Sequence, residues 1–144
     1  MKKVIGRKEE ISIPKWGLVN VPAKIDTGAY TSSIHCEFAE IRVEGGEKTL
    51  YFKLLGPGYH ENNDKLIGTR KFARRKVKNS FGQVETRFMV RCTVLVFGEK
   101  IRTDFTLANR GNMKNPILLG RKLLRGHFLV DVSSTNLASK NQSE

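Results

Sequence analysis

Two neighbouring segments in the second half of the chain carry side chains suited to a core at every second position. The alternating residues are Val90, Cys92, Val94 and Val96 within residues 84–97, and Ile101, Thr103, Phe105 and Leu107 within residues 100–107. A period of two is typical of a β-strand with one buried face, because successive side chains point to opposite faces. The intervening Gly98-Glu99 pair predicts a two-residue turn. The two segments are therefore expected to form a β-hairpin.

Short segments of strand character, separated by turn residues, fill most of the remaining sequence. Further strands are expected at residues 3–13, 18–25, 34–43, 49–55, 72–79, 116–120 and 128–132, and one short helix at 121–125. Such a succession predicts an all-β protein. A chain of 144 residues has the size of one domain, which we expect to span residues 1–132, with a polar, flexible tail at 133–144.

Residues 23–29 place an acidic residue between a short apolar strand and a Thr-Gly turn. Aspartic proteases present their catalytic carboxylate in this way. Gly28 lets the backbone turn tightly and approach a ligand, because it has no Cβ atom. Thr27 can offer a hydroxyl that fixes the loop, and Asp26 is then expected at the mouth of a cleft. An Asp-Thr-Gly tripeptide also forms ordinary turns, so the motif alone leaves a solvated turn as the alternative.

A second motif, a wholly apolar strand that ends in Gly120, follows about ninety residues later. The pair of motifs resembles the retropepsin-like aspartic proteases, in which such a strand lies beside the catalytic loop and runs into a short helix. The physical reason is that the catalytic loop lacks partners of its own in a sheet, so a buried strand must pack beneath it. Gly120 then permits a close approach of the two backbones.

The resemblance extends to the family labelled ATP-dependent zinc proteases. The segments that carry it are 24–29, 31–35, 106–110, 118–121 and 128–131, together with Met113. It covers residues 4 to 131 and implies a small closed retropepsin-like β-barrel, similar to one half of a pepsin-type enzyme. The family pattern has a Pro after Asp131 where this chain has Val132, which affects only the C-terminal turn. Family members commonly accompany ATP-grasp ligases that append glutamate to peptides, which implies a functional link to such a ligase.

Aspartic proteolysis requires two carboxylates a few ångströms apart that share one proton. One of them acts as a base on water, and the other polarises the scissile carbonyl. Because the chain has one Asp-Thr-Gly, we expect a homodimer in which Asp26 of each subunit meets at a two-fold axis. Within one chain, Asp131 at the end of the last strand is the main alternative partner, whereas Asp64 and Asp104 are expected to be exposed.

The expected site extends on both sides of the Asp-Thr-Gly. The expected catalytic residues are Asp26, Thr27 and Gly28, and the expected substrate-binding residues are Ala29, Thr31, Ser32, Arg110 and Arg121. Thr31 and Ser32 have a second interpretation, which is to brace the loop. Each arginine can hold a carboxylate through two hydrogen bonds, and the sequence leaves open whether the pair locks a dimer interface or receives an acidic substrate. A flap is expected from the 44–47 hairpin or the 56–64 loop.

Zinc and ATP appear in the label of the family, but the residues give them little support. His35, His60 and His127 form no closely spaced ligand pair, and a catalytic zinc would require His35, Cys92 and Asp26 to meet in three dimensions. The sequence has no glycine-rich phosphate-binding loop that ends in Lys-Ser or Lys-Thr. We therefore expect no metal and no cofactor, and keep a zinc-dependent hydrolase as the minor alternative.

The chain is strongly basic, with 26 Lys and Arg against 14 Asp and Glu and a net charge of +12. Such a surplus attracts nucleic acids, anionic surfaces or acidic polypeptides. We expect an aspartic peptidase with a peptide or protein substrate, acidic or rich in glutamate. The alternative is a non-catalytic module that binds acidic peptide or RNA through the basic stripe 65–78. Nucleic acid is the less favoured ligand, because no zinc-finger spacing, RNA-binding aromatic signature or clear helix-turn-helix is present.

Cys36 and Cys92 are far apart and form no C-x-x-C pair, which favours reduced thiols in a cytosolic protein. No apolar stretch approaches the roughly 18 residues needed to cross a bilayer. The basic first residues are not followed by the apolar segment of a secretory signal. The sequence therefore predicts a cytoplasmic hydrolase without a membrane partner.

Overall fold

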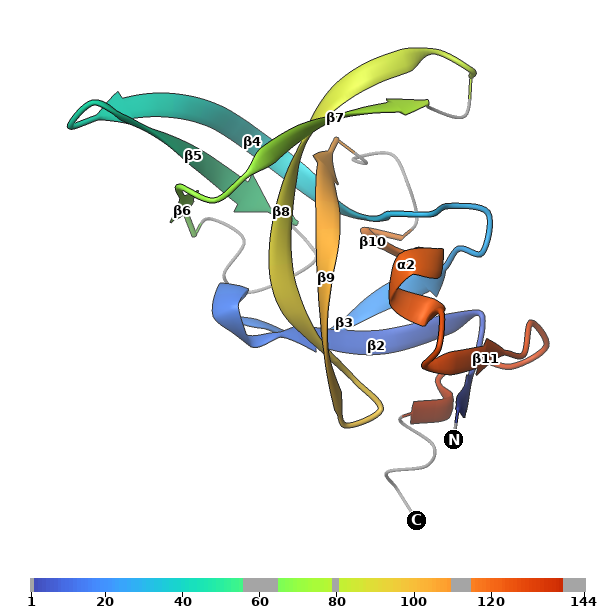
Figure 1. Cartoon of the computed structure of the whole chain (residues 1–144). Coiled ribbons are helices and arrows are strands. Elements are labelled where there is room, and N and C mark those ends of the chain that lie inside the picture. The colour runs from blue at the N-terminus through green and yellow to red at the C-terminus, as the bar shows by residue number, and fades with distance from the viewer. Residues whose placement is uncertain (1, 56–64, 79–80, 110–114, 139–144) are drawn as a thin grey trace.

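Strands make up most of the molecule in the computed structural model, which describes residues 2–55, 65–78, 81–109 and 115–138 (Figure 1). The strands are β1 (Lys3–Ile5), β2 (Lys8–Ile13), β3 (Leu18–Ile25), β4 (Ser32–Glu44), β5 (Glu47–Leu54), β6 (Ile67–Thr69), β7 (Ala73–Lys78), β8 (Val84–Val96), β9 (Glu99–Ala108), β10 (Ile117–Leu119) and β11 (Phe128–Val130). The 3-10 turn η1 (Pro14–Trp16) follows β2, and the helix α2 (Arg121–Leu124) follows β10. The all-β class and the short helix near the C-terminus are confirmed.

A continuous ring of backbone pairing closes the strands into a barrel. β3 pairs with β2, β2 with β8, β8 with β9, and β9 with β4. β10 lies between β4 and β3 and completes the ring, parallel to β3 and antiparallel to β4. The small closed barrel that the sequence predicts is therefore confirmed.

The alternating side chains of β8 and β9 fill the interior of the barrel. Those that are buried include Val90, Cys92, Val94, Val96, Ile101, Thr103, Phe105 and Leu107. Trp16 packs edge-on against Phe52 and Phe105 at ring-centroid distances of 5.7 and 6.3 Å. The turn between the strands differs by one residue from the expectation. Phe97 and Gly98 form it, with φ angles of 54° and 73°, because a turn with two left-handed residues matches the twist of the flanking strands.

Two long hairpins extend beyond the barrel (Figure 1). β4 and β5 form the first, and its tip at Gly45 and Gly46, both with positive φ, is the turn expected at residues 44–47. β7 and the first half of β8 form the second. The second hairpin carries part of the basic stripe 65–78 on its exposed surface, including Arg74 and Arg75.

The first expected strand, at residues 3–13, is two strands in the structure. β1 pairs with β11 and β2 pairs with β3, and the chain bends between them at Gly6. A Cβ atom at Gly6 would lie 2.5 Å from the backbone oxygen of Ser134. The bend therefore depends on glycine, because any side chain would push the C-terminal segment away.

Glu9 holds that C-terminal segment with a buried carboxylate. Its side chain accepts hydrogen bonds from the backbone amides of Gly6, Leu137 and Ala138 at 2.7, 3.0 and 3.1 Å. A buried carboxylate requires such donors, because its desolvation is costly. Residues 136–138, which belong to the polar tail expected from the sequence, thus contact β2. The rest of that expected tail, residues 139–144, lies outside the described residues.

Cys36 and Cys92 are both buried and carry free thiols. Burial raises the pKa of Cys36 to about 11 and that of Cys92 to about 12. Both thiols are therefore protonated at neutral pH and are poor nucleophiles. Among the described residues, no helix is long and apolar enough to cross a bilayer.

Candidate active site

The Asp-Thr-Gly loop connects β3 to β4, and β10 lies between these two strands. Leu119 of β10 pairs with Ile25, and Leu118 pairs with Ser33. The amide of Asp26 donates a hydrogen bond to the carbonyl of Leu119 at 2.9 Å. The second sequence motif therefore supports the first, as expected, and the wholly apolar strand fixes the position at which Asp26 leaves the sheet.

Gly120 brings the start of α2 against the loop. A Cβ atom on Gly120 would lie 2.7 Å from the carbonyl oxygen of Tyr30 and 2.9 Å from that of Ala29. Both of these carbonyls accept hydrogen bonds from the helix, Ala29 from the amide of Arg121 at 2.8 Å and Tyr30 from the amide of Lys122 at 2.9 Å. Only glycine leaves room for this contact between two backbones.

The Arg121 side chain reaches over the loop. Its Nη1 atom donates to the carbonyl oxygen of Thr27 at 3.0 Å, and its guanidinium lies 5.8 Å from the centre of the Tyr30 ring. These contacts fit a bracing role, and Arg121 is not among the described residues that line the cleft beside Asp26. Arg110, the other arginine expected here, lies outside the described residues.

Asp26 is half-buried and lines a cleft of about 680 Å³. Its Oδ1 atom accepts a hydrogen bond from the amide of Gly28 at 3.0 Å, which closes a tight turn of the kind that aspartate stabilises. Gly28, Ala29 and Thr31 also line the cleft. Thr27 is exposed, and it meets Arg121 through its backbone carbonyl.

Ser32 is fully buried, unlike its neighbours in the loop. Its hydroxyl accepts a hydrogen bond from the amide of Gly120 at 3.0 Å, and its carbonyl accepts one from the Thr106 hydroxyl at 3.4 Å. This geometry matches the bracing role that the sequence analysis left open for Ser32, and its burial leaves no surface for a substrate.

The β7–β8 hairpin forms the wall of the cleft opposite the loop. Its contribution comprises Lys76, Val77, Lys78, Phe81, Glu85 and Arg87. No sequence motif identifies this wall. The 44–47 turn, expected as a flap, is not among the lining residues, and the 56–64 loop lies outside the described residues. The one sequence feature that points to the β7–β8 wall is the spacing of Lys76 and Lys78, which places both lysines on the same face of a strand.

Positive charge predominates in this cleft. Arg87 forms an ion pair with Glu85, whereas Lys24, Lys76 and Lys78 form no ion pair with any described residue. These three lysines lie on both walls, since Lys24 belongs to β3. The cleft is therefore suited to an anionic ligand beside the Asp26 carboxylate.

Two of the three other aspartates considered from the sequence, Asp131 and Asp104, have structural partners. Asp131 accepts hydrogen bonds from the amide and hydroxyl of Ser133 at 3.0 and 2.6 Å and from the Ser134 hydroxyl at 2.9 Å. These bonds, those from Ser133 first, hold the pKa of Asp131 below its ordinary value. Asp131 thus closes a turn at the end of β11 and does not line the cleft.

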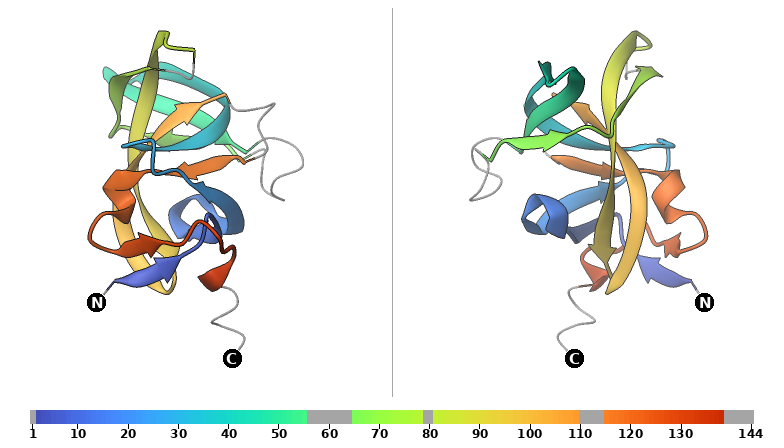
Figure 2. Two further views of the ribbon diagram at one scale, coloured as in Figure 1. Left: turned by 90° about the vertical axis from the view of Figure 1, so that its right-hand side faces the viewer. Right: turned by 60° about the vertical axis from the view of Figure 1, so that its left-hand side comes forward.

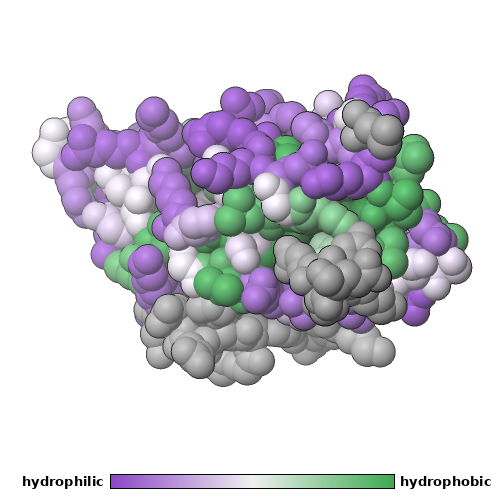
Figure 3. Space-filling model, turned by 90° about the horizontal axis from the view of Figure 1, so that it is seen from below, coloured by the Kyte–Doolittle hydropathy of each residue, from purple (hydrophilic) through white to green (hydrophobic). Residues whose placement is uncertain are grey.

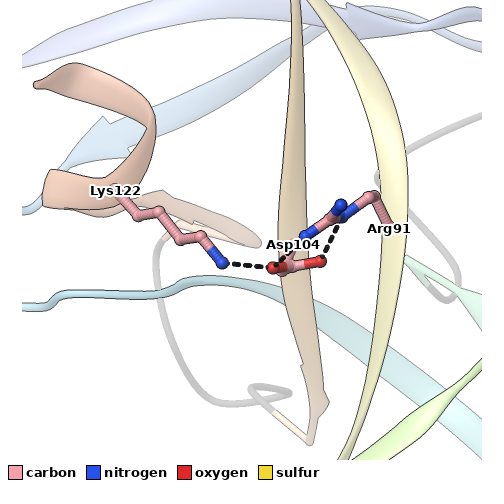
Figure 4. Close-up of polar contacts among 3 residues, drawn as sticks. All are labelled: Arg91, Asp104 and Lys122. Carbon is pink, nitrogen blue, oxygen red and sulfur yellow. Dashed lines mark hydrogen bonds and ion pairs between the residues drawn. The ribbon is translucent and has the colours of Figure 1, made fainter. Parts of the chain in front are cut away.

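Asp104 is buried, contrary to the expectation that it is exposed. Only 4% of the residue is accessible, and its carboxylate lies between Arg91 and Lys122 (Figure 4). The sequence gives no sign of this burial, because Lys122 comes from a helix that packs over β9 only in the folded chain. Asp64 lies outside the described residues.

The described residues do not fit a zinc centre. They contain no group of three or more His, Cys, Asp or Glu side chains placed to hold a metal ion. His35 is fully buried, with Nε2 at 2.7 Å from Oε1 of Glu37. The thiol of Cys36 donates to the Phe38 carbonyl at 3.0 Å. The donors that a catalytic zinc would need from His35, Cys92 and Asp26 are thus not brought together, and His60 lies outside the described residues.

A closed barrel with an Asp-Thr-Gly loop beside an apolar strand and a short helix defines the retropepsin-like class of proteins. The chain belongs to the RimB-like family. Its residues 4–141 match the model of that family, which is described as the retropepsin-like aspartic endopeptidase RimB.

Similar proteins include longer ones. A probable alpha-L-glutamate ligase of Shewanella halifaxensis is 32% identical over 137 residues, and one of Desulfotalea psychrophila is 33% identical over 131 residues. These matches cover 93% and 90% of this chain but only 29% and 28% of the relatives. A Legionella pneumophila protein of unknown function, solved by structural genomics, has the same fold. Its TM-score is 0.76 at 22% identity, over 96% of this chain and 99% of the other.

Proposed function

We propose that the protein is an aspartic-type peptidase in which Asp26 activates water against a peptide bond. The observation that carries this proposal is the position of Asp26, which is half-buried and lines a cleft of about 680 Å³. A loop braced by β10 and by the start of α2 keeps the carboxylate in place, and such preorganisation is what a catalytic group requires.

A second carboxylate completes the reaction, and we propose that a second copy of the chain supplies it. Glu85 is the other acidic side chain among the described lining residues, and Arg87 neutralises it. In such a dimer, one of the two facing carboxylates would act as the base on water and the other would polarise the scissile carbonyl.

The surface next to the loop offers an apolar contact for that second copy. The loop, α2 and β11 lie on the same side of the molecule (Figure 2). Val4 and Leu129, which pair between β1 and β11, are 46% and 55% exposed, and Val132 is 73% exposed. Figure 3 shows hydrophobic residues concentrated on its right, the side on which β1 and β11 lie in Figure 1. Exposed apolar side chains that gather on one face favour association.

An acidic peptide is the substrate that best fits the cleft, because Lys24, Lys76 and Lys78 have no ion pair with the described residues. The relatives give a reason for glutamate in particular. Proteins named as glutamate ligases contain a segment similar to this chain. We propose that the peptidase acts on glutamate-rich peptides and works with such a ligase, in the cytoplasm.

Cleavage of a glutamate-rich peptide by purified protein tests the proposal. Asp26→Asn should reduce the rate at least about a hundredfold, because the variant removes the shared proton system. Asp131→Asn is the matched control, because Asp131 lies in a turn that does not line the cleft. Equal cleavage by wild type and Asp26→Asn would contradict the assignment.

A non-catalytic module is the second candidate, because Arg74, Arg75 and Lys76 on β7 are exposed. Such a module would bind acidic peptide or RNA with a steep dependence on salt. Its signature would be strong binding without cleavage, lost in the triple alanine variant of these residues and unchanged in Asp26→Asn.

A further inference from the structure

We propose that Asp104 is a positioning residue, which holds α2 through Lys122 and thereby fixes the loop that carries Asp26. The inference rests on the proposed function only for its catalytic consequence. Its structural part concerns how a helix of four residues keeps its place.

The carboxylate of Asp104 joins three elements (Figure 4). Oδ1 accepts from Nε of Arg91 at 2.9 Å and Oδ2 accepts from Nη2 at 3.3 Å, which ties β9 to β8. Lys122 Nζ donates to the same Oδ2 atom from α2. The two-pronged contact with arginine fixes the orientation of the carboxylate, so the site that receives Lys122 is preformed.

The carboxylate remains ionised because the cations outweigh its burial. The hydrogen bond from Arg91, and after it the contact with Lys122, hold the pKa of Asp104 below its ordinary value, although burial opposes them. At neutral pH the negative charge under α2 is therefore permanent. Loss of either partner would leave this buried charge with one cation in place of two, and a buried charge that loses part of its compensation is destabilised.

The helix α2 depends on such contacts for its position. It consists of four residues, Arg121–Leu124, and a helix this short is not stable by itself. Leu123 and Leu124 are buried and attach its apolar side. Lys122 attaches the other side to Asp104.

The first amides of α2 transmit this attachment to the loop. Lys122 donates its backbone amide to the carbonyl of Tyr30 at 2.9 Å, and Arg121 donates to that of Ala29 at 2.8 Å. The amide of Ala29 in turn donates to the carbonyl of Asp26 at 3.3 Å. A shift of α2 therefore moves the turn that aims the Asp26 carboxylate.

Amide hydrogen exchange tests the structural part without any need for peptidase activity. In Asp104→Asn and Lys122→Met, exchange of the Arg121 and Lys122 amides should become at least about tenfold faster, whereas the amide of the core residue Val94 should keep its protection. Lys122→Arg retains the cation and should preserve slow exchange. Glu40→Gln is the matched control, because it removes a carboxylate from an exposed ion pair with Arg42.

Kinetics tests the catalytic part on the glutamate-rich peptide. Asp104→Asn and Lys122→Met should lower kcat about tenfold or more with little change in KM, because a displaced catalytic group costs rate and not binding. Glu40→Gln and Lys122→Arg should keep kcat within about twofold of wild type.

The outcomes separate this inference from the proposed function. Unchanged exchange at Arg121 and Lys122, or acceleration equal to that of Val94, would overturn the inference. Unchanged kcat in Asp104→Asn would do the same. Faster exchange in the variants that is confined to the Arg121 and Lys122 amides would support the anchoring of the loop. If the wild-type protein then cleaves no peptide, that result would count against the peptidase proposal alone.

Discussion

At the scale of single residues, the loop depends on a few positions where no other side chain serves. Gly120 lies where backbone carbonyls from Tyr30 and Ala29 leave no space for a Cβ atom. Asp26 and Gly120 were identified from their sequence context, because each belongs to a local motif. The burial of Asp104 was not predicted, because its partner Lys122 belongs to a helix whose position in the fold cannot be inferred from the local sequence pattern.

Gly120→Ala should destabilise the protein by about 1–3 kcal/mol, because the added methyl group overlaps two backbone oxygens and overpacked sites cost energies of this size. Urea unfolding measures the change, and peptide cleavage should fall with it because the loop must move. Stability and cleavage equal to those of wild type would show that the loop is not held against α2.

Asp104→Asn should make stability less dependent on pH. The pKa of Asp104 is lower in the folded chain than in the unfolded chain, so its ion pairs stabilise the fold above about pH 4 and this contribution disappears as the pH falls through the folded pKa. The substitution should cost about 2 kcal/mol at pH 7 and progressively less in acid. Urea unfolding across the pH range would contradict this if the cost were constant.

At the scale of elements, the sequence predicted β8, β9 and β10 well, because alternating or continuous apolar residues determine which face is buried. It predicted one strand at residues 3–13 where the structure has β1 and β2. The bend at Gly6 that separates them depends on a close contact with Ser134, which is distant in sequence and leaves no local pattern. The cleft wall formed by β7 and β8 was missed for the same reason. Nothing in the sequence around the exposed lysines of β7 shows that they lie across a cleft from Asp26.

The β7–β8 hairpin should determine affinity for acidic peptides. Lys76→Ala with Lys78→Ala should raise KM for a glutamate-rich peptide about tenfold, with kcat nearly unchanged, because in the proposed enzyme these charges would contact the substrate away from the reacting atoms. The effect should shrink at high salt, which screens exposed charges.

The matched control for this hairpin is Lys48→Ala with Lys100→Ala. It removes the same charge from two exposed positions outside the cleft. Equal changes in KM for the two double variants would show that net charge, and not the hairpin, attracts the peptide.

At the scale of the whole molecule, the barrel carries one Asp-Thr-Gly loop, and the chemistry needs two carboxylates. The pattern of short strands and the family resemblance predict the fold, and the fold and the family are confirmed. Neither the pattern nor the resemblance predicts how two copies would associate, because an interface depends on how exposed side chains such as Val4 and Leu129 meet those of another copy.

A mixing experiment tests the shared active site most directly. Wild-type and Asp26→Asn chains are unfolded together in equal amounts, refolded, and assayed on the glutamate-rich peptide at constant total concentration. If both Asp26 carboxylates of a dimer are required, about one dimer in four is active, so the rate should fall to about a quarter of the wild-type rate. A fall to one half would show that each chain works alone and would contradict the account.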